Sequence, residues 1–157
     1  MSKAVVVYFS HTGHTRKLAE KIAERTGADL VEIRTDHTYP TDYHQAVDQV
    51  MEELRQKFQP EIQVDISDWE RYDTVFLGSP NWWSNMAPAV QAFIRSHTFQ
   101  GKELCPFCTN GGDGNGYLGK MMEHAAKPAS CRPILGMVQD TIDEAALERW
   151  LSLCEKK

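Results

Sequence analysis

The sequence has 157 residues, of which 41% are hydrophobic and 25% charged, and this composition suits a single globular domain. Its formal net charge of −5 argues against the basic surface of a nucleic-acid-binding protein. No apolar run approaches the roughly 20 residues of a membrane span, and the N-terminal segment lacks the features of a signal peptide. We therefore expect a cytoplasmic protein whose cysteines are reduced thiols.

Short apolar runs rich in strand-forming residues alternate with segments of helical period along the whole chain. Strands are predicted over residues 4–9, 29–33, 74–77, 104–109 and 134–138, and helices over 15–25, 43–58, 87–96 and 117–126. A last helix is predicted to begin at the capping box formed by residues 141–144. Gly27 and Pro60 are the predicted ends of the first two helices, and residues 62–66 are a further candidate strand.

This alternation predicts an α/β fold, a doubly wound five-stranded parallel sheet with helices on both faces. The chain shows no linker or internal repeat, so residues 1–157 are assigned to one domain. Sheets of this kind bind ligands beyond the carboxyl ends of their strands, where the strand order reverses. The loops after the first, third and fourth strands are therefore the predicted binding site.

The loop after the first strand reads Ser10-His11-Thr12-Gly13-His14-Thr15 and leads into a helix. Its glycine permits close approach of the backbone, and the helix start offers unpaired N–H groups and a positive dipole end to an anion. The three hydroxyls can each donate to a phosphate oxygen. Because a helix cap needs only one such residue, the loop predicts a phosphate site. The Lys-Ser/Thr ending of a nucleoside triphosphatase loop is absent from it.

The pattern Ser-x-Thr-Gly-x-Thr between a first strand and a helix resembles the phosphate loop of flavodoxins, which holds the 5′-phosphate of FMN. The resemblance implies that residues 10–15 bind this phosphate. His14 stands where the family usually has asparagine, although its backbone N–H can still serve. Phosphate binding that depends on pH through His11 or His14 is a further hypothesis.

The loop after the third predicted strand contains Pro80-Asn81-Trp82-Trp83. Two adjacent tryptophans do not easily reach the core together, so one can be buried while the other contacts a flat heteroaromatic ligand. The segment resembles the Pro-x-Trp-Trp loop of a short flavodoxin subfamily, which lies along the flavin near its N5 atom. This implies that all four residues contact the ring, and it leaves open which tryptophan plays which part.

Residues 109–116 are the most glycine-dense stretch of the chain. Glycines let main-chain amides wrap the polar edge of a flavin, although the same composition also suits a flexible loop without a ligand. In flavodoxin-like proteins the corresponding loop contacts the ring, which implies contacts from Thr109, Asn110, Gly111, Gly112 and Asp113. Tyr117 is a candidate for stacking on the ring, or it belongs to the following helix.

Two other motifs suggest rival interpretations. Residues 114–119 match the G-x-G-x-x-G dinucleotide fingerprint with Asp140 downstream, but this fingerprint normally opens the first βα turn. Cys105 and Cys108 have the C-x-x-C redox spacing, but they fall in a predicted strand, where residues three apart face opposite sides of the sheet. We expect two buried thiols there. No further cysteine pair suggests zinc, and no catalytic or metal-ligating residue is predicted.

The resemblance to flavodoxins covers nearly the whole chain and implies the short-type flavodoxin-like sheet with strand order 2-1-3-4-5. It further implies a protein that binds FMN and shuttles electrons between redox partner proteins, a reductase and an acceptor. One alternative is a small NAD(P)H-dependent quinone or nitro reductase that uses FMN. Another is a flavodoxin-fold interaction module without flavin. The sequence does not determine the oligomeric state.

Overall fold

The computed structural model describes residues 3–11, 13–82, 84–110, 112, 114–139 and 141–155. Its strands are β1 (Ala4–Tyr8), β2 (Asp29–Glu32), β3 (Thr74–Pro80), β4 (Glu103–Asn110), β5 (Ser130–Cys131) and β6 (Leu135–Val138). Its helices are α1 (His14–Thr26), α2 (Tyr43–Arg55), α3 (Pro88–Ser96), α4 (Leu118–Ala125) and α5 (Glu144–Glu155), with a short 3-10 helix at Trp69–Arg71. No helix in these residues is long and apolar enough to cross a membrane.

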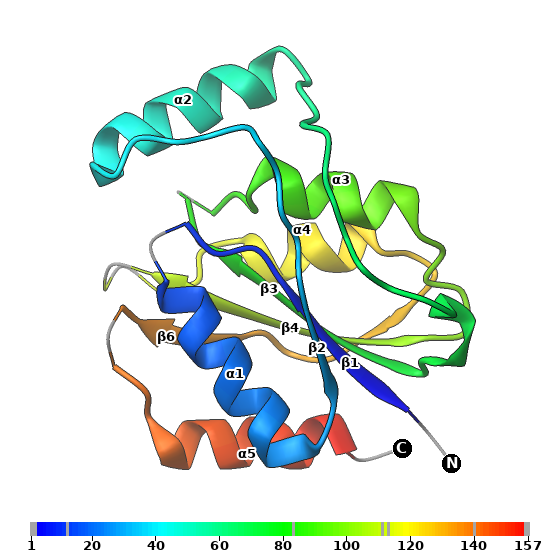
Figure 1. The fold of residues 1–157 in the computed structure, drawn as a ribbon. Helices are drawn as coiled ribbons and strands as arrows, with labels where there is room; N and C mark the ends of the chain where they lie inside the picture. The colour runs from blue at the N-terminus through cyan, green and yellow to red at the C-terminus, as the bar shows by residue number, and fades with distance from the viewer. Residues whose placement is uncertain are drawn as a thin grey trace.

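The strands form one parallel sheet in the order β2-β1-β3-β4-β5, with β6 also paired to β4. Helices α1 and α5 cover one face, and α3 and α4 cover the other (Figure 1). Helix α2 lies on the same side as α3 and links β2 to β3 (Figure 1). The predicted α/β fold with strand order 2-1-3-4-5 is confirmed.

Two hydrophobic cores lie on the two faces of the sheet. Val5 and Val7 of β1 belong to one core together with Phe93 of α3, whereas Val6 of β1 belongs to the other together with Trp150 of α5. Because successive residues of a strand point to opposite faces, a strand buried on both sides needs an unbroken apolar run. This requirement explains the sequence of β1.

The fifth strand of the sheet is interrupted, which the sequence did not predict. Both β5 and β6 pair with β4 at this edge of the sheet, but the register of β6 with β4 is shifted by one residue from the register of β5 with β4. The carbonyls of Leu104 and Asn110 accept from the amides of Arg132 and Gln139, so alternate residues of β4 face this edge. Pro106 belongs to the same alternation but has no N–H to donate, and the pairing breaks opposite it.

Gly27 follows α1 in the left-handed region (φ 71°), as expected, whereas the end of α2 differs from the prediction by three residues. Helix α2 ends at Arg55, before the predicted limit of residue 58 and well before Pro60. Lys57 takes a left-handed conformation (φ 56°) and Phe58 N–H donates to Glu53 O, which closes the helix as a Schellman motif.

The start of the last helix also differs, because Asp143 caps it through a bond from Ala146 N–H to its Oδ1 atom. The predicted capping box at residues 141–144 is therefore wrong. Residues 62–66 do not form the candidate strand, and only Gln63 pairs there, in an isolated antiparallel bridge with Arg34.

Candidate functional site

The loops after β1, β3 and β4 meet at the carboxyl end of the sheet, as the fold class predicts. The Thr15 and Thr109 hydroxyls are 2.8 Å apart, which joins the first loop to the end of β4. The Asn81 side chain donates to Gly114 O at 2.8 Å, which joins the second loop to the third. Most of the buried polar residues of the described chain lie at this end: Thr15, Ser79, Asn81, Thr109 and Asn110.

Backbone amides converge at the start of α1. Gly13 has a positive φ of 97° and precedes the first helical residue, His14. The Ser10 hydroxyl accepts hydrogen bonds from the amides of Gly13 (3.1 Å) and Arg16 (3.2 Å). Ser10 thus caps the helix, and it marks the point where an anion would meet the same donors and the positive end of the helix dipole.

A cavity of about 170 Å³ lies beside this helix start. Six of the residues expected from the sequence line it: His11, His14, Thr15, Pro80, Trp82 and Thr109. Thr41, Ala46 and Gln139 also line it. The structure therefore brings hydroxyl, imidazole and indole groups from three loops to one hollow.

Trp82 is buried, with only 3% of its surface exposed. Its ring lies 5.7 Å from the His11 ring and 5.0 Å from the Tyr39 ring, measured between centroids. His11 is held further by a 2.6 Å contact between its Nε2 atom and Pro40 O. Because a carbonyl oxygen only accepts, Nε2 carries the proton. An aromatic cluster therefore forms one wall of the cavity.

Asn81 fixes the turn of the tryptophan loop. Its side-chain Oδ1 atom accepts a hydrogen bond from Ser84 N–H at 2.8 Å, and its backbone N–H donates to Thr109 O at 2.8 Å. Ser84 has a positive φ of 66° and lies inside a tight turn closed by paired bonds between Trp82 and Asn85. Asn81 is thus a structural link between three segments of the site.

The glycine loop begins later than the sequence suggested, because Thr109 and Asn110 are the last residues of β4. Asn110 Oδ1 accepts from Gly112 N–H at 2.8 Å, which turns the chain away from the strand. Tyr117 stands just before α4, and 74% of its surface is exposed. Four other predicted contacts, Thr12, Trp83, Gly111 and Asp113, lie outside the described residues, as does Asp140.

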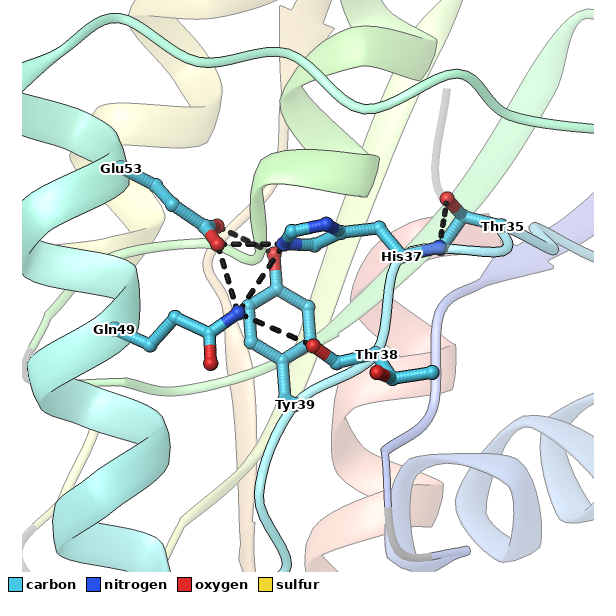
Figure 2. Close-up of polar contacts among 6 residues, drawn as sticks. All are labelled: Thr35, His37, Thr38, Tyr39, Gln49 and Glu53. Atoms are coloured by element: carbon cyan, nitrogen blue, oxygen red, sulfur yellow. Dashed lines mark hydrogen bonds and ion pairs between the residues drawn. The ribbon is translucent and has the colours of Figure 1, made fainter.

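Sequence reasoning missed a polar network behind the aromatic wall. Glu53 of α2 accepts from the Tyr39 hydroxyl and contacts His37 and Gln49 (Figure 2). Burial raises the pKa of the Tyr39 hydroxyl, and the hydrogen bond to Glu53 and the negative charge of Glu53 raise it further, so the hydroxyl stays protonated and donates. No sequence motif marks these residues. The one feature that could have pointed to the network is Tyr39, an aromatic residue in the segment before α2.

Two of the three glycines of the dinucleotide fingerprint, Gly116 and Gly119, have packing roles within the protein. A Cβ atom at Gly119 would lie 2.9 Å from Ile134 Cγ2, and one at Gly116 would lie 1.8 Å from Ser84 Oγ. Close packing between segments therefore accounts for both glycines without a nucleotide.

The two cysteines of the C-x-x-C spacing are buried in opposite cores, as predicted: Cys105 lies in the core with α1 and α5, and Cys108 in the other. A hydrogen bond with Cys154 and burial raise the pKa of Cys105, which disfavours the reactive thiolate. Among the described residues, no group of histidine, cysteine and acidic side chains could hold a metal ion.

Comparison with known proteins shows which family this chain resembles. Residues 3–154 match the family model described as Flavodoxin. A structure of a protein from Bacteroides eggerthii, assigned as a flavoprotein, is 30% identical and aligns over 100% of both chains with a TM-score of 0.84. A flavoprotein from Lactobacillus acidophilus, crystallised in complex with FMN, shares the fold at 23% identity (TM-score 0.76, 96% of this chain and 99% of that one).

The flavodoxin FldP of Pseudomonas aeruginosa is 49% identical over 49 residues. This match covers 31% of the present chain and 27% of that flavodoxin, so the chain matches only about a quarter of the length of this curated relative.

Proposed function

The chain belongs to the Flavodoxin family, and from this premise we propose that it binds one FMN at the carboxyl end of its sheet and passes electrons between redox partner proteins. The observation that carries this proposal is the convergence of the amide-rich start of α1, the aromatic wall and the end of β4 on one cavity. The FMN bound to the Lactobacillus relative supports the choice of cofactor.

The chemistry of the cavity fits the phosphate end of FMN. The amides of Gly13 and Arg16 point to a common acceptor, Ser10 Oγ, and phosphate oxygens can accept from the same donors. The Thr15 and Thr109 hydroxyls line the same hollow. At about 170 Å³ the cavity is smaller than the roughly 300–1,000 Å³ of whole-ligand pockets. It therefore suits the phosphate and ribityl end rather than the complete nucleotide.

The flavin ring is assigned to the rim between the tryptophan loop and the end of β4. Pro80, Asn81 and Trp82 are the proposed ring contacts from the tryptophan loop, and Asn110 and Gly112 are those from the end of β4 and the turn after it. The proposed ring contacts also include Trp83, Gly111, Asp113 and the exposed Tyr117, and the proposed phosphate contacts include Thr12. Glycines at this rim let backbone amides approach the polar edge of a flavin.

The bound flavin would supply the redox chemistry, and the protein would orient it and control its access to water. No side chain in the described part of the site is assigned as acid, base or nucleophile. The role proposed for this chain is that of a carrier, whose electrons come from one protein and go to another, and membership of the Flavodoxin family supports it.

A kinetic comparison separates a carrier from an NAD(P)H-dependent reductase. The FMN-loaded protein is mixed with NADPH or NADH and a quinone, beside free FMN at the same concentration. A carrier oxidises the nicotinamide no faster than free FMN does, and stepwise chemical reduction shows a one-electron stage in its absorption spectrum. Saturable oxidation of NADPH far above the free-flavin rate would refute the carrier role and favour the reductase.

A further inference from the structure

We infer that Glu53 is a positioning residue for the flavin site and that it acts through Tyr39. This inference rests on the proposed binding of FMN. Glu53 lies on α2, outside the cavity lining, and only 8% of its surface is exposed. Buried carboxylates are costly unless their oxygens are hydrogen-bonded, so its partners explain why it is there.

Three donors converge on the Glu53 carboxylate (Figure 2). The Tyr39 hydroxyl donates to Oε1 at 2.8 Å, and His37 Nε2 lies 2.5 Å from Oε2. Gln49 Nε2 donates to Oε2 at 3.0 Å and also to Thr38 O at 3.1 Å. Glu53 and Gln49 thus fasten the segment between β2 and α2 to the inner face of α2.

Tyr39 carries this restraint into the site. Its ring centroid lies 6.1 Å from His11, which belongs to the loop after β1, and 5.0 Å from Trp82, which belongs to the loop after β3. The next residue, Pro40, supplies the carbonyl that holds His11. One ring therefore packs against two of the three loops assigned to the flavin, and the carbonyl of Pro40 fixes one of these two.

The bond between Tyr39 and Glu53 determines where this ring lies. Tyr39 is 9% exposed, so its hydroxyl has little access to water as a substitute acceptor. Without the carboxylate, the ring would have to move to satisfy its hydroxyl, and the contacts with His11 and Trp82 would change with it. Packing alone would not hold the ring, because its edge-to-face contact with His11 and its tilted contact with Trp82 are less directional than a hydrogen bond to a charged acceptor.

The test measures FMN binding to flavin-stripped wild-type protein and to the variants Tyr39→Phe, Glu53→Ala, Glu53→Gln and the Tyr39→Phe/Glu53→Ala double variant. Glu52→Gln is the matched control, because Glu52 is on the same helix but pairs with Arg55 and Gln56 on the surface. Affinity comes from quenching of flavin fluorescence, and circular dichroism of the bound flavin reports its surroundings. Thermal unfolding of each apoprotein shows that the binding measurements are made on folded protein.

We expect Tyr39→Phe and Glu53→Ala each to weaken FMN binding by about three- to tenfold and to change the flavin circular dichroism, since each removes a hydrogen bond to a charged group. The double variant should bind no more weakly than Glu53→Ala, because both changes remove the same link. Glu53→Gln keeps an acceptor oxygen and should recover part of the loss. Glu52→Gln should bind FMN as the wild type does.

The inference is overturned if the Tyr39→Phe and Glu53→Ala losses add fully, or if Tyr39→Phe leaves both affinity and circular dichroism unchanged. It is also overturned if Glu52→Gln weakens binding as much as Glu53→Ala, because the effect would then belong to the whole helix. Failure of the wild type itself to bind FMN would contradict the proposed function instead, so the two failures are distinguishable.

Discussion

Gly116 joins the glycine loop to the tryptophan loop, and replacing it with alanine should separate them. Its φ of +55° is unfavourable for alanine, and the new Cβ atom would lie 1.8 Å from Ser84 Oγ and 2.9 Å from Ser84 Cβ. Rotation of the serine side chain relieves only the first contact. The Ser84 amide is bonded to Asn81 Oδ1, so relief of the second requires the tryptophan loop to shift.

The matched control is Gly114→Ala in the same loop. Gly114 also has a positive φ, +83°, but a Cβ atom there would meet nothing within 4 Å. A left-handed conformation costs a non-glycine residue about 1–2 kcal/mol, and overpacking costs about 1–3 kcal/mol more. We therefore expect losses of about 1–2 kcal/mol for Gly114→Ala and about 2–5 kcal/mol for Gly116→Ala.

Urea unfolding of the two apoproteins measures these losses, and FMN titration measures the effect on the site. Gly116→Ala should weaken FMN binding more than Gly114→Ala, because only the former brings a new atom against the tryptophan loop. Equal stabilities and equal affinities for the two variants would refute the close contact between Gly116 and Ser84. They would also reopen the interpretation of these glycines as a dinucleotide fingerprint.

Three further changes probe other features. Ser10→Ala should lower apoprotein stability in urea by about 1 kcal/mol, the usual loss for a helix cap, and the loss should shrink in saturating FMN, whose phosphate offers replacement acceptors. Lys102→Met should lower the free energy of unfolding by about 1–3 kcal/mol, because the buried ammonium donates to the carbonyls of Trp69 and Tyr72. FMN affinity should not change, since these bonds lie far from the site. An unchanged free energy of unfolding would contradict this role. Burial raises the pKa of Cys131 to about 11, so its alkylation rate should rise about tenfold per pH unit from 8 to 10, whereas a plateau above pH 9 would indicate an ordinary thiol.

The sheet and the convergence of three loops at its carboxyl end were predictable because they follow from periodicity and topology. Alternating strands and helices impose the strand order, and the carboxyl ends of parallel strands bring the loops of Ser10, Asn81 and Thr109 together. The opposite orientation of Cys105 and Cys108 follows in the same way from the two-residue period of a strand.

The features that escaped prediction depend on side-chain contacts between distant segments. Thr141 and Asp143 are both residue types that cap helices, and local sequence does not distinguish them, whereas the structure shows Ala146 N–H bonded to Asp143 Oδ1. The bond between Tyr39 and Glu53 crosses from an irregular segment to a helix, so no spacing rule marks it. The interruption opposite Pro106 was readable in principle, because proline cannot donate to a neighbouring strand.

Titration of the flavin-stripped protein with FMN and with riboflavin tests the central claim most directly. We expect saturable quenching of flavin fluorescence by FMN at a ratio of one to one. Riboflavin should bind at least about a hundredfold more weakly, since it cannot make two charge-assisted bonds worth about 1.5 kcal/mol each. Absence of saturable FMN binding, or equal affinities for the two flavins, would contradict a phosphate site at the start of α1.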